Sequence, residues 1–244
     1  MGVSLEERNV LEINKVHCGD CLELMKQIPD KSVDMILCDL PYQKTGCDWD
    51  VIIPFDKLWK QYDRIKKDKC PVVLFGTESF SSLMRVSNLK EFKYDWIWHK
   101  KQCGNLFLAK RQPLKTFETI SVFYKHNYYP QMTKGKMRKK GGGNHNKIFG
   151  NTDASYNDLY YPVAILEFAN CSKKSDKLHP TQKPVALFEY LIKTYTNEGD
   201  LVLDNCAGSG TTGVACKNLN RNFILIEKEE KYCEIARRRI DEIK

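Results

Sequence analysis

The chain has 244 residues, and its hydrophobic content of 42% is enough to bury the core of one large domain, or of a domain with an insert. Lys and Arg together number 39 against 31 Asp and Glu, and the resulting formal charge of +8 favours an anionic partner such as nucleic acid. The longest apolar runs fall far short of the ~18 residues that a membrane-spanning helix needs, so the sequence excludes a transmembrane protein.

The N-terminal residues lack the basic start and apolar stretch of a secretory signal, and we therefore expect a cytoplasmic protein. Ten cysteines are too sparse for a disulfide scaffold in a chain with an ample core, so we expect reduced thiols. Cys18 and Cys21 form a C-x-x-C pair beside His17, which is at most half of a zinc site or a redox pair. No second pair completes a tetrahedral ligand set, and we expect no metal.

Apolar runs of strand length alternate with segments of helical spacing, the pattern of a parallel sheet covered by helices. A first short strand ends at the Gly19–Asp20 pair, and residues 31–38 predict a buried central strand. Residues 55–65 place apolar side chains at helical spacing, and residues 71–75 predict the next strand. Together these segments predict a β-α-β unit.

Two further strands are predicted at residues 94–99 and 119–124, on either side of a loop. The composition then changes, because residues 125–178 hold ten basic and four acidic residues and show little periodicity. Most of the positive charge of the chain therefore lies in this segment. After it the pattern returns to alternating helices and strands, with the strands at residues 201–204 and 223–226.

A glycine-rich turn follows the strand at residues 201–204, because Gly208, Gly210 and Gly213 match the G-x-G-x-x-G pattern. The pattern suits a dinucleotide or another adenosine cofactor. Too few residues follow Gly213 for the second half of a dinucleotide-binding fold, unless the fold is permuted. Glu227 ends the next strand, where its carboxylate can accept hydrogen bonds from both ribose hydroxyls, and the alternative is an exposed strand-end acid.

A DLPY block at residues 39–42 follows the predicted buried strand, and alone it is consistent with an ordinary strand-ending turn. The block resembles the DPPY motif of amino-DNA methyltransferases. It precedes the basic segment, the HPTQKP block at residues 179–184 and the AGSGTT turn at residues 207–212, an order that resembles the beta group of that family. The likeness covers residues 17–240 and is weakest across residues 125–178. Protein-glutamine methyltransferases, whose NPPY motif follows the glycine turn, fit less well.

The resemblance implies a doubly wound α/β fold with a mostly parallel, seven-stranded sheet, the class I methyltransferase fold in permuted order. Residues 1–124 would form the catalytic part, residues 125–178 a small target-recognition insert and residues 179–244 the cofactor-binding part. S-adenosylmethionine is the implied cofactor. The implied reaction is methylation of adenine N6 in DNA, as in restriction-modification.

Cytosine N4 is the alternative target, because both exocyclic nitrogens present two hydrogens to the same motif. An Asp at the first motif position favours adenine in the family. A remoter alternative is a non-catalytic nucleic-acid-binding protein that kept the fold, which would be expected to lose either DLPY or the glycine turn. We also expect a homodimer, because specific DNA interfaces bury about 1,000–2,500 Å² and the recognition segment is compact. A cognate restriction endonuclease is a possible further partner.

Four residues carry the reaction by this resemblance. The Asp39 carboxylate and the Leu40 carbonyl accept the two N–H hydrogens of a flipped base, so that the nitrogen lone pair is directed at the methyl donor. Tyr42 offers an aromatic face to the extruded base. The family has proline where this chain has Leu40, and Pro41 keeps Leu40 extended.

The resemblance also implies a set of cofactor-binding residues. They are Asp20, Thr181, Gln182, Lys183, Asp204, Ala207, Gly208, Ser209, Gly210, Thr211 and Glu227. Asp20 would lie near the adenine, Glu227 on the ribose and the glycine turn near the amino-acid end. Two alternatives stay open, since Lys183 is also consistent with a solvated surface residue and Asp204 with a helix N-cap.

Basic and amide side chains outside these motifs predict contacts to DNA. They are Asn105, Lys110, Arg111, Lys134, Lys136, Arg138, Lys139 and Lys140. Lys and Arg neutralise phosphates, and amides can hydrogen-bond base edges. The alternative for the run at residues 134–140 is a solvated, mobile loop.

Overall fold

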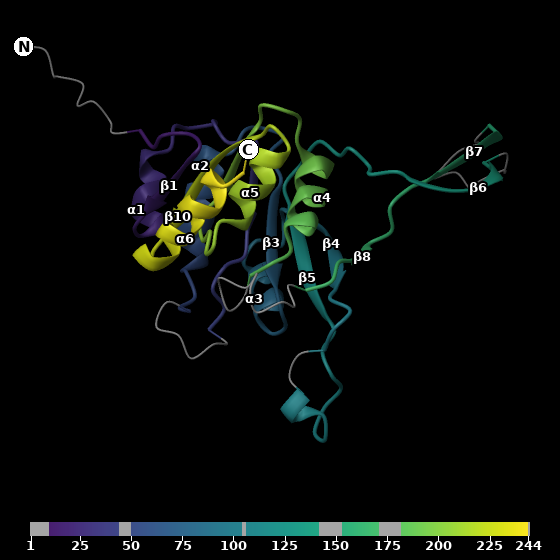
Figure 1. The fold of residues 1–244 in the computed structure, drawn as a ribbon, viewed down its shortest axis with the longest axis horizontal. Coiled ribbons are helices and arrows are strands. Elements are labelled where there is room, and N and C mark those ends of the chain that lie inside the picture. Colours follow the sequence, from purple (N-terminus) through teal and green to yellow (C-terminus); the bar gives the residue numbers. More distant parts are fainter. Residues whose placement is uncertain (1–9, 44–49, 104–105, 142–152, 171–181, 244) are drawn as a thin grey trace, which may run out of the picture. The chain divides into compact units, whose positions relative to one another are not determined.

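The computed structural model describes residues 10–43, 50–103, 106–141, 153–170 and 182–243. The chain forms two compact units (Figure 1). One unit combines residues 1–129 with residues 164–244, and the other is residues 130–163. None of the helices in the described ranges has the length and apolar character to cross a membrane.

The first unit is built on a central sheet. Within the described residues it has eight strands in the order β1-β10-β9-β2-β3-β5-β4-β8. Their bounds are β1 Lys15–Cys18, β2 Met35–Cys38, β3 Val72–Gly76, β4 Phe92–His99, β5 Phe117–Phe123, β8 Ile165–Glu167, β9 Leu201–Asp204 and β10 Asn222–Glu227. Only β5 runs antiparallel to its neighbours β3 and β4 in these described pairings, so the sheet is mostly parallel and the expected fold class is confirmed.

The expected number of seven strands was one too low. The extra strand is β8, which pairs parallel to the edge strand β4 at Ile97, Trp98 and His99. Its three residues are too short for a recognisable period, and only Leu166 among them is buried. The sequence therefore offered no strand signal here.

Helices cover both faces of the sheet. Their bounds are α1 Cys21–Leu24, α2 Phe55–Ile65, α3 Phe80–Ser87, α4 Val185–Tyr195, α5 Thr211–Asn218 and α6 Glu230–Asp241, with short 3-10 turns at Met25–Gln27 and Leu106–Leu108. Successive residues of β2 point to opposite faces, so that Met35 and Leu37 pack with α4, α5 and α6, and Ile36 and Cys38 pack with α2 and α3. These two apolar layers make the fold doubly wound (Figure 1).

The order of the strands brings distant parts of the sequence together. β2 pairs parallel with β9, and β9 pairs parallel with β10. The carboxyl ends of these three strands therefore meet at one edge of the sheet, where ligands bind in α/β folds. The DLPY block and the glycine turn follow neighbouring strands, although the recognition segment separates them in the chain.

The second unit contains an antiparallel pair of strands, β6 Thr133–Lys140 and β7 Ser155–Tyr160. The loop alternative for the basic run is therefore wrong, because the run is the strand β6. Its side chains are nearly all exposed, so no apolar alternation marks it as a strand. Tyr160 instead stabilises the pair, with the Arg138 guanidinium 3.9 Å and the Lys140 ammonium 4.6 Å from its ring centre.

Candidate active site

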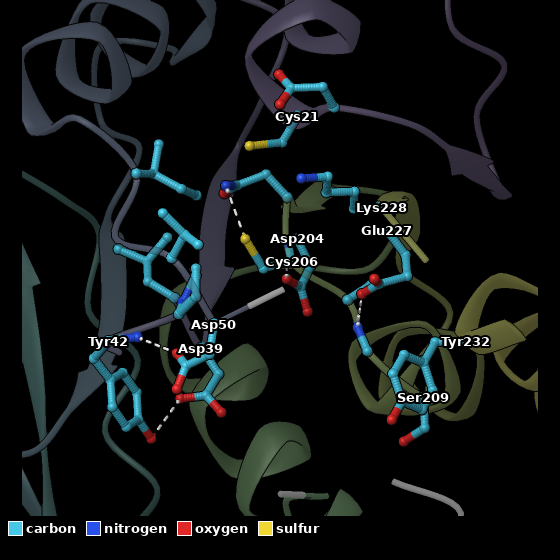
Figure 2. Close-up of a pocket in the computed structure, with 18 of the residues that line it drawn as sticks. Cys21, Asp39, Tyr42, Asp50, Asp204, Cys206, Ser209, Glu227, Lys228 and Tyr232 are labelled. Carbon is cyan, nitrogen blue, oxygen red and sulfur yellow. Dashed lines mark hydrogen bonds between the residues drawn. The ribbon is translucent and has the colours of Figure 1, made fainter. Parts of the chain in front are cut away.

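A cavity lies at the carboxyl ends of β2, β9 and β10 (Figure 2). Most of the residues that the sequence predicts for the reaction and the cofactor line it. These are Asp20, Asp39, Leu40, Pro41, Tyr42, Gln182, Lys183, Asp204, Ala207, Gly208, Ser209, Thr211 and Glu227. The structure thus brings the DLPY block, the glycine turn, and Gln182 and Lys183 of the HPTQKP block to one site, while Thr181 lies outside the described residues.

Asp50 holds the DLPY turn in place. Its Oδ1 accepts hydrogen bonds from the backbone N–H of Tyr42, at 2.9 Å, and of Gln43, at 2.8 Å. Asp50 is only 4% exposed, so these bonds form away from water, where they matter most. The sequence analysis missed Asp50, because a single acid eight positions beyond the motif carries no pattern of its own.

Tyr42 and Asp39 lie next to each other in the turn (Figure 2). The Tyr42 ring packs 5.3 Å, centre to centre, from Phe80, and its hydroxyl lies 3.5 Å from Asp39 Oδ1. The Leu40 side chain is buried among apolar residues. Replacing the family's proline by leucine therefore fills a core position and leaves the backbone carbonyl in the turn.

Lys183 forms an ion pair with Asp39, and both residues line the cavity. Its ammonium donates to Asp39 Oδ2 and lies 3.5 Å from Glu118 Oε2. The Lys183 side chain is 6% exposed, so the alternative of a solvated surface lysine is wrong. Burial lowers the pKa of Lys183, but the carboxylates of Asp39 and Glu118 outweigh this and raise it well above the ordinary value. Lys183 therefore carries its charge at neutral pH.

Burial raises the pKa of Asp39, and the ammonium of Lys183 opposes this rise. A buried carboxylate is costly unless a cation or hydrogen-bond donors compensate it. Lys183 provides that compensation on Oδ2. The second oxygen, Oδ1, accepts from the Tyr42 hydroxyl at 3.5 Å, and Asp39 lines the cavity.

Glu227 ends β10 and faces the opposite side of the cavity from Tyr42 (Figure 2). Its Oε2 accepts from the Gly208 N–H at 2.7 Å, and its Oε1 accepts from the Glu229 N–H at 2.9 Å. Glu227 is 9% exposed, so the alternative of an exposed strand-end acid is wrong. Asp20, also at the cavity, accepts from the N–H groups of Leu22 and Glu23 at the start of α1.

Asp204 fixes the glycine turn through hydrogen bonds to both of its carboxylate oxygens. Its Oδ1 accepts from the Cys206 N–H at 3.1 Å, and its Oδ2 accepts from the Thr212 hydroxyl. Burial raises the pKa of Asp204 to about 7. The N-cap of α5 is Gly210 rather than Asp204, so the capping alternative for Asp204 is also wrong.

Gly210 has a packing role that the sequence pattern does not indicate. It does not line the cavity as the described residues define it. A Cβ at Gly210 would lie 2.8 Å from the Ala236 Cβ, and the backbone φ is +76°. The lack of a side chain therefore allows the close packing of α6 and a left-handed turn, while the place of Gly210 near the cofactor stays a prediction.

The two cysteines of the C-x-x-C pair have different neighbours. Cys21 lines the cavity together with Cys206, whereas Cys18 lies with Cys233 and Glu230, the Sγ and carboxylate atoms of these three residues within 4.8 Å of one another. All cysteines within the described residues are free thiols. The motif therefore does not act as one pair.

The residues predicted to contact DNA are distributed over both units. Lys134, Lys136, Arg138 and Lys139 are exposed on β6, and Lys140 is half-buried at its end. Lys110 and Arg111 are exposed in the first unit, just after the 3-10 turn at Leu106–Leu108. Asn105 lies outside the described residues.

The chemistry of the cavity fits an adenosine cofactor that carries a positive charge. Asp20, Asp39 and Glu227 line it, together with Ala207, Gly208, Ser209 and Thr211 of the glycine turn. Carboxylates can accept from ribose hydroxyls, and they favour a cationic sulfonium. Lys183 is already neutralised by its own carboxylate partners.

The model of the N6/N4 DNA methylase family matches residues 33–238. The type II methyltransferase M.HinfI of Haemophilus influenzae is 29% identical over 264 aligned positions, which cover 95% of this chain and 69% of that protein. M.HpaI of Haemophilus parainfluenzae is 26% identical, over 92% of this chain and 73% of that protein.

Solved structures agree with this match. The complex of M1.HpyAVI with S-adenosylmethionine is 27% identical, with a TM-score of 0.64, over 93% of this chain and 98% of that chain. The cytosine-N4-specific PvuII methyltransferase shares the fold, with a TM-score of 0.68 at 17% identity, over 94% of this chain and 87% of that chain. The family match covers most of the chain and agrees with the motif order and with the cavity, so the protein belongs to the N6/N4 DNA methylase family and uses S-adenosylmethionine as its cofactor.

Proposed function

We propose that this DNA methyltransferase modifies the exocyclic N6 of adenine. The observation that carries the proposal is the carboxylate of Asp39, held at the cavity with Oδ2 on Lys183 and Oδ1 beside Tyr42. A carboxylate is the stronger of the acceptors available at the first motif position, and an Asp there favours adenine in the family. The PvuII enzyme, at 17% identity, supports the fold and does not bear on the base.

In this proposal each residue of the DLPY turn has one task. Asp39 Oδ1 and the Leu40 carbonyl accept the two N–H hydrogens of the amine, which concentrates electron density on the nitrogen that attacks. Tyr42, supported by Phe80, offers its ring to the extruded base. The cofactor supplies an electrophilic methyl group when bound. Asp50 keeps the turn in register through its bonds to Tyr42 and Gln43.

We propose that Glu227 accepts the ribose hydroxyls of the cofactor and that Asp20 lies near its adenine. Both line the cavity, and two backbone N–H groups hold the Glu227 carboxylate in a fixed orientation. Ala207, Gly208 and Ser209 then lie at its amino-acid end. The parts of the chain follow from this assignment: residues 1–124 supply the acceptor side, residues 179–244 the cofactor side, and residues 125–178 the target-recognition insert that contains the compact unit of residues 130–163.

We propose that β6 contacts the DNA backbone. Its lysines and Arg138 are mostly exposed, and Tyr160 and Asn157 of β7 hold Arg138 and Lys140 in defined positions. Ammonium and guanidinium groups on a narrow strand pair suit contact with phosphates. Lys110 and Arg111, with Asn105, would add contacts from the first unit.

The experiment that tests the proposal identifies the modified base. The protein is incubated with labelled S-adenosylmethionine and duplex DNA of mixed sequence, and the DNA is digested to nucleosides. Label in N6-methyl-2′-deoxyadenosine that is absent with Asp39→Ala supports the proposal. Label in N4-methyl-2′-deoxycytidine would establish the alternative target, and an equally active Asp39→Ala would overturn the role of Asp39.

We also propose that the active form is a homodimer. Leu83, Val86 and Leu89 are 57%, 72% and 66% exposed on α3 and just beyond it, and these apolar side chains are available to a second copy. Light scattering at micromolar protein is expected to give twice the chain mass of 28.4 kDa. A mass of one chain, with and without DNA, would reject the dimer. A genomic neighbour encoding an endonuclease for the same site would be the test of a restriction partner.

A further inference from the structure

Four buried or partly buried charges form a continuous chain that begins at Asp39. Asp39 pairs with Lys183, Lys183 lies 3.5 Å from Glu118 Oε2, and Glu118 Oε1 accepts from the ammonium of Lys100. The four residues come from the end of β2, the start of α4, β5 and the end of β4. Glu118 and Lys100 lie outside every motif of the sequence, and neither lines the cavity within the described residues.

The burial of Glu118 is the observation that calls for an explanation. Glu118 is 6% exposed, and a carboxylate at that depth is stable only if it is compensated. Burial raises its pKa, but the charges of Lys183 and Lys100 outweigh burial and lower it. Glu118 is therefore ionised at neutral pH. The four charges sum to zero, and the aromatic faces of Phe75 and Trp98, 5.5 Å from Lys183 and 5.2 Å from Lys100, enclose the two ammonium groups.

We propose that Glu118, braced by Lys100, is a positioning residue that holds Lys183 on Oδ2 of Asp39 and so keeps Oδ1 available to the target amine. The inference rests on the proposed function, in which Asp39 accepts an N–H of that amine. A lysine stem is flexible, and its ammonium is a compact charge with three donors. With Glu118 opposite Asp39, the ammonium has an attraction on each side and is held between the two carboxylates.

Without the Glu118 charge, Asp39 is the only carboxylate that can compensate the buried Lys183 within this cluster. The ammonium then moves toward Asp39 and withdraws electron density from both of its oxygens. A weaker acceptor gives less stabilisation to the transition state, while the binding of cofactor and DNA is unaffected. Loss of Lys100 acts in the same direction, because it frees Glu118 from its fixed position.

The charge of Glu118 also affects the titration of Asp39. Burial raises the pKa of Asp39, the Lys183 charge lowers it, and the Glu118 charge raises it. The groups that face Asp39 are Lys183, Glu118, Lys100, Tyr42 and Asp204, with the thiol of Cys38, while Asp50 lies against Tyr42. Removing the negative charge of Glu118 should therefore lower the pKa of Asp39, so the acid limb of kcat moves to lower pH.

The test compares Glu118→Gln with wild type and with Glu167→Gln. Glu167 is a matched control, because it pairs with Lys101 at 3.1 Å but is 58% exposed, on β8 beside β4 and outside the compact unit of residues 130–163. Glu118→Gln is expected to lower kcat about tenfold or more, with KM for cofactor and DNA within about twofold and the acid limb displaced to lower pH. Glu167→Gln is expected to behave as wild type.

A second pair of variants covers the case in which Glu118→Gln does not fold. Lys100→Arg keeps the cation that braces Glu118 and is expected to retain most of kcat, whereas Lys100→Met is expected to lose it. Wild-type kcat and pH profile in Glu118→Gln, or equal kcat in the two Lys100 variants, would overturn the inference. Asp39→Ala separates the two proposals, since an active Asp39→Ala overturns the proposed function itself, whereas an inactive one beside an unaffected Glu118→Gln overturns only the positioning role.

Discussion

The sheet edge that carries the cavity and the β6–β7 unit use charge in opposite ways. At the cavity, Asp39, Lys183 and Glu118 are largely buried and compensate one another. On β6, the basic side chains are mostly exposed and outnumber their acidic partners. One of them, Lys134, has its ammonium 3.6 Å from the Asp158 carboxylate. Buried charges that compensate one another act strongly on neighbouring groups but add no net charge to the surface. Exposed, uncompensated charges attract an anion through solvent. The comparison predicts that changes at the cavity alter turnover and changes on β6 alter DNA binding.

The largest effect is expected from Asp39→Ala. The variant removes an acceptor that acts on the amine in the transition state, so kcat should fall by about 10²- to 10³-fold, the range for loss of one electrostatic acceptor or donor. Calorimetry should give a cofactor affinity near that of wild type. Asp39→Asn, which keeps one carbonyl oxygen, should retain more activity than Asp39→Ala. A proportional loss of cofactor affinity would show that the buried pair with Lys183 is structural.

The next effect concerns the salt dependence of DNA binding. Neutralising the five basic residues of β6, Lys134, Lys136, Arg138, Lys139 and Lys140, should flatten the log–log salt slope by about one unit for each lost phosphate contact. Turnover at saturating DNA should change little. The control neutralises five exposed lysines of the first unit, Lys31, Lys57, Lys60, Lys69 and Lys90. Equal slopes in both variants would place the DNA on another face.

A smaller effect is expected at Asp50, which has no contact with the amine in the proposed mechanism. Asp50→Ala leaves the N–H groups of Tyr42 and Gln43 without their acceptor, a cost of about 1–3 kcal/mol for a buried group. The turn then loses its fixed geometry, and kcat should fall by about ten- to a hundredfold at an unchanged cofactor affinity. Asp50→Asn offers a carbonyl oxygen at the same place and should recover most of kcat. Identical rates for both variants would contradict this role.

The smallest effect is on stability and separates packing from ligand contact at the glycine turn. Gly210→Ala brings a Cβ within 2.8 Å of Ala236, whereas Gly199→Ala meets nothing within 4 Å, and both positions have positive φ. Gly210→Ala should therefore lower the melting temperature by several degrees more than Gly199→Ala, consistent with about 1–3 kcal/mol of overpacking. A loss of cofactor affinity at an unchanged melting temperature would instead support a contact of Gly210 with the cofactor.

The site could be predicted from the sequence because its residues lie at the ends of predicted strands. Asp39, Glu227 and the glycine turn each follow an apolar run, and parallel strands place such ends at one edge, so the cavity was predictable. The helix at residues 55–65 was equally predictable, because its buried side chains follow the helical period. By contrast, Glu118 comes near Asp39 through the pairings of β5 with β3 and of β3 with β2, and Lys100 comes near Glu118 through the pairing of β4 with β5. No local pattern contains that information.

The β6–β7 pair was missed for a different reason. Apolar alternation arises when one face of a strand is buried, and β6 has no buried face. Its strand character depends on cross-strand contacts of Tyr160 and Asn157, which come from a segment that the sequence separates from β6. Motifs therefore predicted the chemical part of the molecule better than the part proposed to recognise DNA.

The two junctions of the second unit carry a practical consequence. Just before the unit begins, the Tyr129 N–H donates to the Thr194 carbonyl at 2.8 Å, and just after it ends, the Ala164 carbonyl accepts from the Ile97 N–H at 2.8 Å. The polypeptide is thus tied to the catalytic framework on both sides of residues 130–163. Residues 130–163 can be replaced without altering a strand pairing of the main sheet. These junctions are natural points for grafting the corresponding segment of a relative, and a changed target site in such a chimera would support the proposal that this segment recognises the target.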